Sequence, residues 1–106
     1  MTYIYQVSFD IRPDQMSELQ IGSSLERVLG YLRTLLPNES GFVSARAQYS
    51  LDVPDTTHLV FESTWERWED LETHRQSELS ETKVLDEFEP HVSMEHLTVH
   101  VYEEVP

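Results

Sequence analysis

Cysteine is absent from this 106-residue sequence, and its absence removes several kinds of chemistry. Without thiols the chain has no disulfide, no thiolate nucleophile, no zinc–thiolate site and no iron–sulfur cluster. The sequence also lacks an apolar run of about 18 residues, the length that a membrane-spanning helix requires. The first ten residues lack the basic start and apolar core of a secretory signal, so we expect a cytoplasmic protein.

Positive charge is also scarce, because 7 lysines and arginines face 20 aspartates and glutamates, a formal net charge of -13. Most of the excess lies in residues 51–106. A chain this acidic repels phosphate backbones and anionic lipids, so we expect neither nucleic acid nor a membrane as a partner. The acidic residues are typical of solvated helix faces, and a field that attracts a cation or excludes anionic substrates is the alternative.

The sequence does contain enough apolar surface for one compact unit. Hydrophobic residues make up 39% of the chain, which is typical of a globular protein rather than a disordered one. A chain of this length forms one domain, so we predict that residues 1–106 are a single unit.

Alternating apolar and polar side chains predict an antiparallel sheet, since a strand that buries one face has an apolar residue at every second position. Segments with this pattern cover residues 2–11, 42–51, 57–63 and 96–103. Helical segments follow the first and the third of them. The order strand, helix, strand, strand, helix, strand is typical of an α+β, ferredoxin-like βαββαβ fold with helices on one face of the sheet.

The helices are predicted from apolar residues at helical spacing. The first is either one helix weakened near Gly22 or two helices broken there, and we favour one helix. Ser63 and Glu66 have the spacing of a capping box, so the second helix is expected to begin at about Thr64. A further short helix is expected around residues 84–88.

The predicted strands have a second face that mixes polar and apolar side chains, opposite the helix-facing register that includes Val43 and Tyr49. In a monomer this mixed face is solvated. Its apolar members also suit contact with a second sheet, so we favour a homodimer through this face. The polar members are Gln6, Asp10, Arg46, Gln48, His58, Glu62, His96 and His100, and the apolar members are Ile4, Phe42, Val60 and Tyr102.

Two histidines of the last predicted strand, His96 and His100, are four residues apart. On a helix this spacing places two ligands on one face, where they can share a metal ion. On a strand the same spacing separates them by about 13 Å, which is too far for one ion. His58 and Glu62 fail by the same geometry, so we predict no metal site unless a dimer brings another ligand.

A short motif resembles one known family. Residues 61–66 read Phe-Glu-Ser-Thr-Trp-Glu, and residues 71–74 read Leu-Glu-Thr-His. This pattern resembles the antibiotic-biosynthesis monooxygenase family, in which a strand that ends in Trp-Glu leads into a helix with a Leu-Glu-x-His ending. The resemblance implies a dimeric α+β barrel with a pocket between helices and sheet. It also implies that a small aromatic molecule, phenolic or quinol, is oxidised by molecular oxygen with no metal or flavin cofactor.

The resemblance also implies which side chains serve the pocket. His74 matches the histidine of the quinol-oxidising members, and would act as the acid–base or substrate-orienting group. Trp65 would be a wall of the pocket, or else a core residue at the corner between sheet and helix. Arg75 either pairs with Glu72, which we favour, or anchors an anionic substrate. Tyr5 and Tyr49 lie on the helix-facing strand registers and are therefore candidates for the pocket lining, and core packing is the alternative for them and for Trp68. The predicted substrate-binding residues are Trp65, Tyr5, Tyr49, Trp68 and Arg75.

Departures from the family pattern argue against two of the reactions that members of the family catalyse. Phe61 and Leu71 stand where the polyketide-quinone-forming members carry asparagine and tyrosine. His74 and Val84 stand where the haem-degrading branch carries a tryptophan and its histidine ligand, so haem cleavage ranks lowest. The alternative to an enzyme is a non-enzymatic, small-molecule-binding or stress-associated dimer on the same fold.

Overall fold

Four antiparallel strands form one sheet in the order β2-β3-β1-β4. The computed structural model describes residues 1–50, 54–76, 84–93, 95 and 97–106. The strands are β1 (Tyr3–Ile11), β2 (Phe42–Tyr49), β3 (Thr57–Trp65) and β4 (Thr98–Glu103). The helices are α1 (Glu18–Thr34), the short 3-10 helix η1 (Leu36–Asn38) and α2 (Trp68–Gln76).

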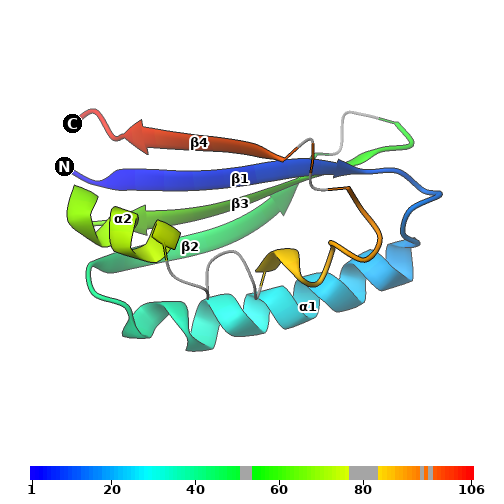
Figure 1. Cartoon of the computed structure of the whole chain (residues 1–106), viewed down its shortest axis with the longest axis horizontal. Helices are drawn as coiled ribbons and strands as arrows, with labels where there is room; N and C mark the ends of the chain where they lie inside the picture. Colours follow the sequence, from blue (N-terminus) through cyan, green and yellow to red (C-terminus); the bar gives the residue numbers. More distant parts are fainter. Residues whose placement is uncertain (51–53, 77–83, 94, 96) are drawn as a thin grey trace.

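The helices lie on one side of this sheet (Figure 1). α1 runs along the sheet, and α2 lies near the end at which both chain termini are found. The arrangement confirms the predicted α+β, ferredoxin-like βαββαβ fold. In the last predicted helix, Val84 and Leu85 are helical, and turns follow over residues 86–91.

α1 is a single helix, as favoured from the sequence. A capping box closes its first turn, because the Gln20 backbone N–H donates to Ser17 Oγ and the Ser17 backbone N–H donates to Gln20 Oε1. This cap supplies partners for backbone groups that the helix cannot satisfy itself. The helix therefore begins at Glu18 and continues through Gly22 without a break.

β3 is longer than predicted, and the helix after it begins later. The strand continues to Trp65, which pairs with Tyr3 of β1, and α2 begins only at Trp68. The predicted helix start at Thr64 is wrong because Ser63 is not a cap: its hydroxyl accepts a hydrogen bond from Trp65 Nε1 at 2.9 Å inside the core. Pairing along the whole of β1 therefore outweighs the local capping signal.

A β-bulge in β2 exchanges two side chains between the faces of the sheet. The register shifts between Phe42 and Ser44, so Phe42 packs against Trp65 while Val43 is 47% exposed. Strict alternation predicts the reverse, and the extra residue of the bulge explains the error. Tyr49, at the far end of this edge strand, is also exposed rather than covered by a helix.

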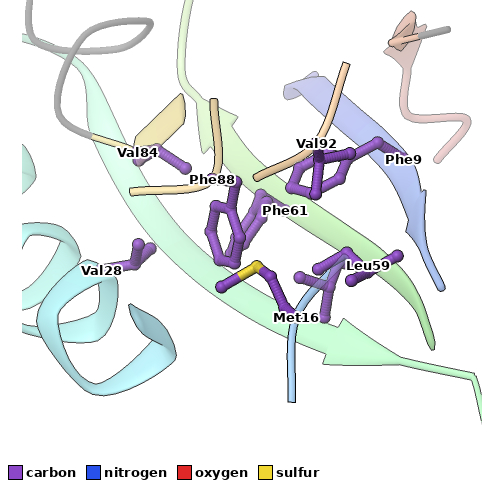
Figure 2. Close-up of a cluster of buried hydrophobic side chains, with 9 residues drawn as sticks. Phe9, Met16, Val28, Leu59, Phe61, Val84, Phe88 and Val92 are labelled. Atoms are coloured by element: carbon purple, nitrogen blue, oxygen red, sulfur yellow. The ribbon is translucent and has the colours of Figure 1, made fainter. Parts of the chain in front are cut away.

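The interior contains two clusters of buried side chains. In the larger cluster Phe88 lies beside Phe61 (Figure 2), and its ring centroid is 5.1 Å from that of Phe9. Because Phe88 is fully buried, it anchors the segment 84–93 against the sheet. The smaller cluster lies nearer the termini and consists of Tyr5, Leu36, Trp65 and Leu71.

The sheet face away from the helices carries polar side chains that pair across strands. Glu62 of β3 accepts hydrogen bonds from Arg46 of β2 and Gln6 of β1, each at 2.7 Å. Burial alone raises the pKa of Glu62, but these hydrogen bonds and the Arg46 charge outweigh it and hold the pKa below its ordinary value of 4.5. His58 Nδ1 and Asp10 Oδ1 form a second pair at 2.6 Å.

β4 begins at Thr98, two residues later than predicted, and places His100 on this outer face opposite Gln6. His96 lies outside the described residues, as does Leu79 of the predicted second helix. Within the described ranges, no group of three or more histidine, aspartate and glutamate side chains is placed to hold a metal ion. Over the same ranges, no helix is long and apolar enough to cross a membrane.

Candidate functional site

A cavity of about 60 Å³ lies between the sheet and the segments that cover it. Its walls are mostly apolar and come from α1, η1, the inner face of the sheet and the start of the 84–93 segment. An apolar pocket with a few polar groups is typical of a small-molecule site. The apolar lining is Val7, Leu32, Leu35, Leu36, Phe61, Val84, Leu85 and Leu97, and the other lining residues are Tyr5, Tyr31, Glu62, Ser63 and His74.

His74 is a buried titratable side chain at this cavity. It lies in α2, and only 4% of its surface is exposed. Its imidazole stacks on the Trp65 indole, with ring centroids 4.5 Å apart and an angle of 27° between the planes. The Tyr5 ring meets the imidazole edge to face at 5.8 Å. These two contacts fix the plane of the imidazole.

Glu39 supplies a charged partner for His74. Its Oε2 lies 3.1 Å from His74 Nδ1. A carboxylate only accepts hydrogen bonds, so this contact favours the neutral imidazole that carries its proton on Nδ1 and its lone pair on Nε2. Burial lowers the pKa of His74 below its ordinary value of 6.5, while the charge and the hydrogen bond of Glu39 oppose that shift. His74 is therefore mainly a neutral base at pH 7.

The turn between η1 and β2 brings Glu39 to this position. Glu39 follows η1 directly, and its backbone N–H donates to the Leu36 carbonyl at 3.0 Å. Pro37, in the first turn of η1, restricts the backbone there. Gly41 then adopts a φ of 78°, which glycine tolerates without strain, and its carbonyl accepts the Glu66 backbone N–H at 2.8 Å. The turn is thus tied to the segment that leads into α2.

Three of the six predicted site residues come together. Tyr5 and His74 both line the cavity, and they reach it from β1 and α2. Trp65 is fully buried against the imidazole, with its Nε1 bonded to Ser63 and its ring packed on Phe42. Trp65 therefore supports His74 from the core and is not itself among the described residues that line the cavity.

The other three predicted residues lie elsewhere, and none is among the described residues that line the cavity. Tyr49 is 57% exposed at the end of β2. Trp68 is 43% exposed at the start of α2, where its ring meets Tyr3 edge to face at 5.8 Å. Arg75 Nη1 lies 3.6 Å from Glu72 Oε1, which is the pairing favoured from the sequence.

Comparison with solved structures places this site in a known fold. A structure named as an antibiotic biosynthesis monooxygenase is 18% identical, aligns over 100% of both chains and has a TM-score of 0.66. The chain has the fold of the antibiotic biosynthesis monooxygenases. A dimeric, ferredoxin-like protein from Bacteroides fragilis is 14% identical over 97% of this chain and 96% of its own, with a TM-score of 0.71. A hydroxynitrile lyase from Passiflora edulis is 21% identical over 98% and 97%, with a TM-score of 0.63. No family model and no curated protein matches the sequence.

The part of the cavity lining that the structure describes is apolar, with few charged groups. None of these described lining residues is a lysine or an arginine. His74 is mainly neutral at pH 7, and Glu39 is its ion-pair partner among the described residues. Within this part of the lining, a carboxylate or phosphate group would find no cationic side chain to replace its lost hydration.

Sequence reasoning misses two residues of this site. Tyr31 lines the cavity from α1, and it lies three residues after the fully buried Val28, so the helical period could have identified it. Glu39 has no comparable signal, since it belongs to a turn and its partner His74 is 35 residues away in the sequence. Only the folded turn reveals this contact.

Proposed function

We propose that this chain is a cytoplasmic oxygenase that uses molecular oxygen, without a cofactor, to oxidise a small neutral phenol or quinol. The observation that carries the proposal is His74, a neutral base buried at an apolar cavity. Removing the hydroxyl proton of a phenol makes its ring electron-rich enough to reduce oxygen. The main demand on the protein is therefore a positioned base in a dry site.

His74 Nε2 is the base in this scheme, because it carries the lone pair when the proton is on Nδ1. The substrate hydroxyl gives its proton to Nε2, and the phenolate forms in surroundings from which water is largely excluded. Apolar walls then favour electron transfer to oxygen, which is itself apolar, over reprotonation from solvent. Tyr5 lies against the imidazole and could meet the substrate ring.

The reaction balances without an added reductant. A ring C–H bond breaks and a C–O bond forms, so one oxygen atom becomes a ring carbonyl. The other oxygen atom leaves as water, together with the ring hydrogen and the hydroxyl hydrogen of the substrate. The substrate supplies all the electrons that reduce oxygen, so a phenol and O₂ give a quinone and water.

The small size of the cavity requires side chains to move before an aromatic substrate can bind. An apolar cavity of about 150 Å³ binds benzene, whereas this cavity measures about 60 Å³. An aromatic ring therefore enters only when lining side chains change rotamer, while oxygen fits the existing space. The lining residues best suited to such a rotamer change include Leu32, Leu35 and Leu85. Leucine is not branched at Cβ, so its side chain changes rotamer more easily than that of valine or isoleucine.

We also infer that the outer sheet face joins two copies of the chain. Ile4 and Tyr102 pair across β1 and β4 on this face, and Tyr102 is 45% exposed. A structure of the same fold is named dimeric, which supports the inference. Analytical ultracentrifugation of Tyr102→Glu tests it, with Tyr49→Glu on the opposite face as the control. A wild-type monomer would reject this interface.

A second candidate function uses the same base without oxygen. The fold is also that of a hydroxynitrile lyase. A cyanohydrin could give its hydroxyl proton to His74 and split into a carbonyl compound and cyanide, which takes the proton back from His74 and leaves as hydrogen cyanide. The non-enzymatic alternative is a protein that binds a neutral aromatic molecule and releases it unchanged. The three candidates differ in products: water and a quinone, hydrogen cyanide, or none.

The test replaces His74 with glutamine and follows oxygen uptake with a panel of phenols and quinols. Loss of the base is expected to reduce kcat/KM by about 100-fold or more. His91→Gln is the matched control, because His91 is exposed in a turn away from the cavity. Full activity of His74→Gln would reject the role of this residue. Cyanide release from aromatic cyanohydrins without oxygen would favour the lyase, and ligand binding without turnover would favour the binding protein.

A further inference from the structure

The Glu39 side chain reaches from the surface to a buried imidazole. It retains 19% of its exposure, whereas the His74 side chain retains 5%. Its two carboxylate oxygens lie 3.1 and 3.4 Å from His74 Nδ1. The backbone of Glu39 is fixed by the hydrogen bond to Leu36, and the carboxylate is held by its contact with His74. A held carboxylate on one imidazole nitrogen determines what the other nitrogen can do.

We propose that Glu39 is the positioning residue of the site: it selects the His74 tautomer with the proton on Nδ1 and stabilises the imidazolium that forms when Nε2 takes a substrate proton. This inference deepens the proposed function and rests on it for the identity of the base. Glu39 acts through His74 and need not touch the substrate. Glu39 lies just after a turn that contains Pro37, outside the sequence pattern at residues 61–74 that resembles the monooxygenase family.

The surroundings of His74 explain why such a residue is needed. Trp65 and Tyr5 cover the imidazole, and a cation buried between aromatic rings without a counter-charge is costly. Burial accordingly lowers the pKa of His74, and Glu39 is the group that opposes this effect. The other titratable residues in the described part of the cavity lining are Tyr5 of β1, Tyr31 of α1 and Glu62 of β3, and the Glu62 side chain lies on the outer face of the sheet. The Glu62 carboxylate is engaged by Arg46 and Gln6.

Nuclear magnetic resonance of protein labelled with ¹⁵N-histidine tests the contact without any substrate. The chain has five histidines, and the His74 signals are assigned by their loss in His74→Gln. In the wild type, the neutral ring is expected to carry its proton on Nδ1. In Glu39→Ala, the proton is expected to move to Nε2, which is the tautomer that free imidazole side chains prefer. A wild-type ring protonated on Nε2 would overturn the proposal.

Glu39→Gln separates charge from hydrogen bonding. The glutamine carbonyl can still accept from Nδ1, so the tautomer should persist, but loss of the negative charge should lower the pKa of His74 further. The acid limb of the pH–rate profile should move to lower pH, and kcat should fall by about tenfold or more with little change in KM. Glu39→Asp keeps the charge and should recover part of kcat.

Glu72→Gln is the matched control, because it removes a carboxylate of the same helix that pairs with Arg75 rather than His74. It should leave the tautomer, the pKa of His74 and kcat as in the wild type. If Glu39→Gln behaves like Glu72→Gln in the magnetic resonance titration, Glu39 is only a structural turn residue. If the expected tautomer and pKa changes appear but no substrate is turned over, the Glu39 contact stands and the oxygenase proposal fails.

Discussion

Truncating Leu32 to alanine should open the cavity enough to admit a small aromatic ring. Leu32 lines the cavity from α1 and packs against both buried clusters. The cavity of about 60 Å³ falls roughly 90 Å³ short of one that binds benzene. Alanine is the best helix former, so α1 itself should tolerate the change. The variant therefore tests where the ring binds rather than whether the helix forms.

The stability cost follows from the burial of Leu32. Replacing a buried leucine by alanine typically costs about 2–5 kcal/mol, and because Leu32 is only partly buried, we expect the free energy of unfolding to fall by about 2 kcal/mol. A domain of this size loses about 4–8 °C in Tm for each kcal/mol, so the expected decrease is about 10 °C. Since small domains are typically stable by about 5–15 kcal/mol, the variant should remain folded at room temperature.

Thermal unfolding with and without phenol measures the effect. At a phenol concentration about 100 times its Kd, binding would return about 2.7 kcal/mol, and Leu32→Ala should recover its Tm. Leu29→Ala is the control, because Leu29 is a partly buried leucine of the same helix that lies away from this cavity. Equal stabilisation of both variants, or none in Leu32→Ala, would refute the placement of the ring beside His74.

Three further predictions concern stability. Because the pKa of His74 is lowered by burial, with Glu39 opposing, the unfolded chain takes up this proton first as the pH falls. The free energy of unfolding should therefore fall as the pH drops below about 6.5, and urea titrations should find this part of the decrease missing in His74→Gln. Gly41→Ala should cost about 1–3 kcal/mol, because the residue has a φ of 78° and a methyl group would collide with the Asp70 carboxylate. Gly30→Ala, in α1 with open space around it, should instead stabilise by about 0.5–1 kcal/mol in the same urea assay.

The order of the elements is predictable because one physical requirement repeats along the chain. Each strand buries one face, so alternation marks β1 and β3 clearly, and the apolar spacing around Val28 marks α1. Six elements in that order leave few ways to cover one face of an antiparallel sheet. The fold therefore follows from periodicity, and the resemblance at residues 61–74 points to the same architecture.

The errors in the predicted strands and helix start occur where pairing with a neighbouring strand, rather than the local sequence pattern, determines the structure. Phe42 and Val43 exchange faces because a bulge adds one residue to β2, which alternation cannot anticipate. Ser63 has the spacing of a helix cap, yet its strand gains more by continuing alongside β1 to Trp65. Both features depend on a neighbouring strand that the sequence window does not contain.

The site residues likewise divide into those that the sequence pattern predicts and those that depend on the folded structure. The motif leads to His74 and Trp65, and strand alternation leads to Tyr5, so these residues could be named from the sequence. Tyr49 and Trp68 are aromatic like the residues at the cavity, but Tyr49 lies at the end of an edge strand and Trp68 at the start of α2, and both are exposed. Glu39 could not be predicted from the sequence, because its contact with His74 depends on the conformation of a turn.

Because Trp65 stacks on His74, the intrinsic fluorescence of Trp65 should report the protonation of His74. The chain has two tryptophans, and they lie in opposite surroundings: Trp65 is fully buried, whereas Trp68 is 43% exposed. Their emission should therefore separate by wavelength, with Trp65 at the blue end and accessible quenchers acting mainly on Trp68. A protonated imidazole in contact with an indole quenches its fluorescence, so the blue component should dim each time His74 gains a proton. Intrinsic fluorescence can thus follow proton transfer at the cavity in real time, without a label.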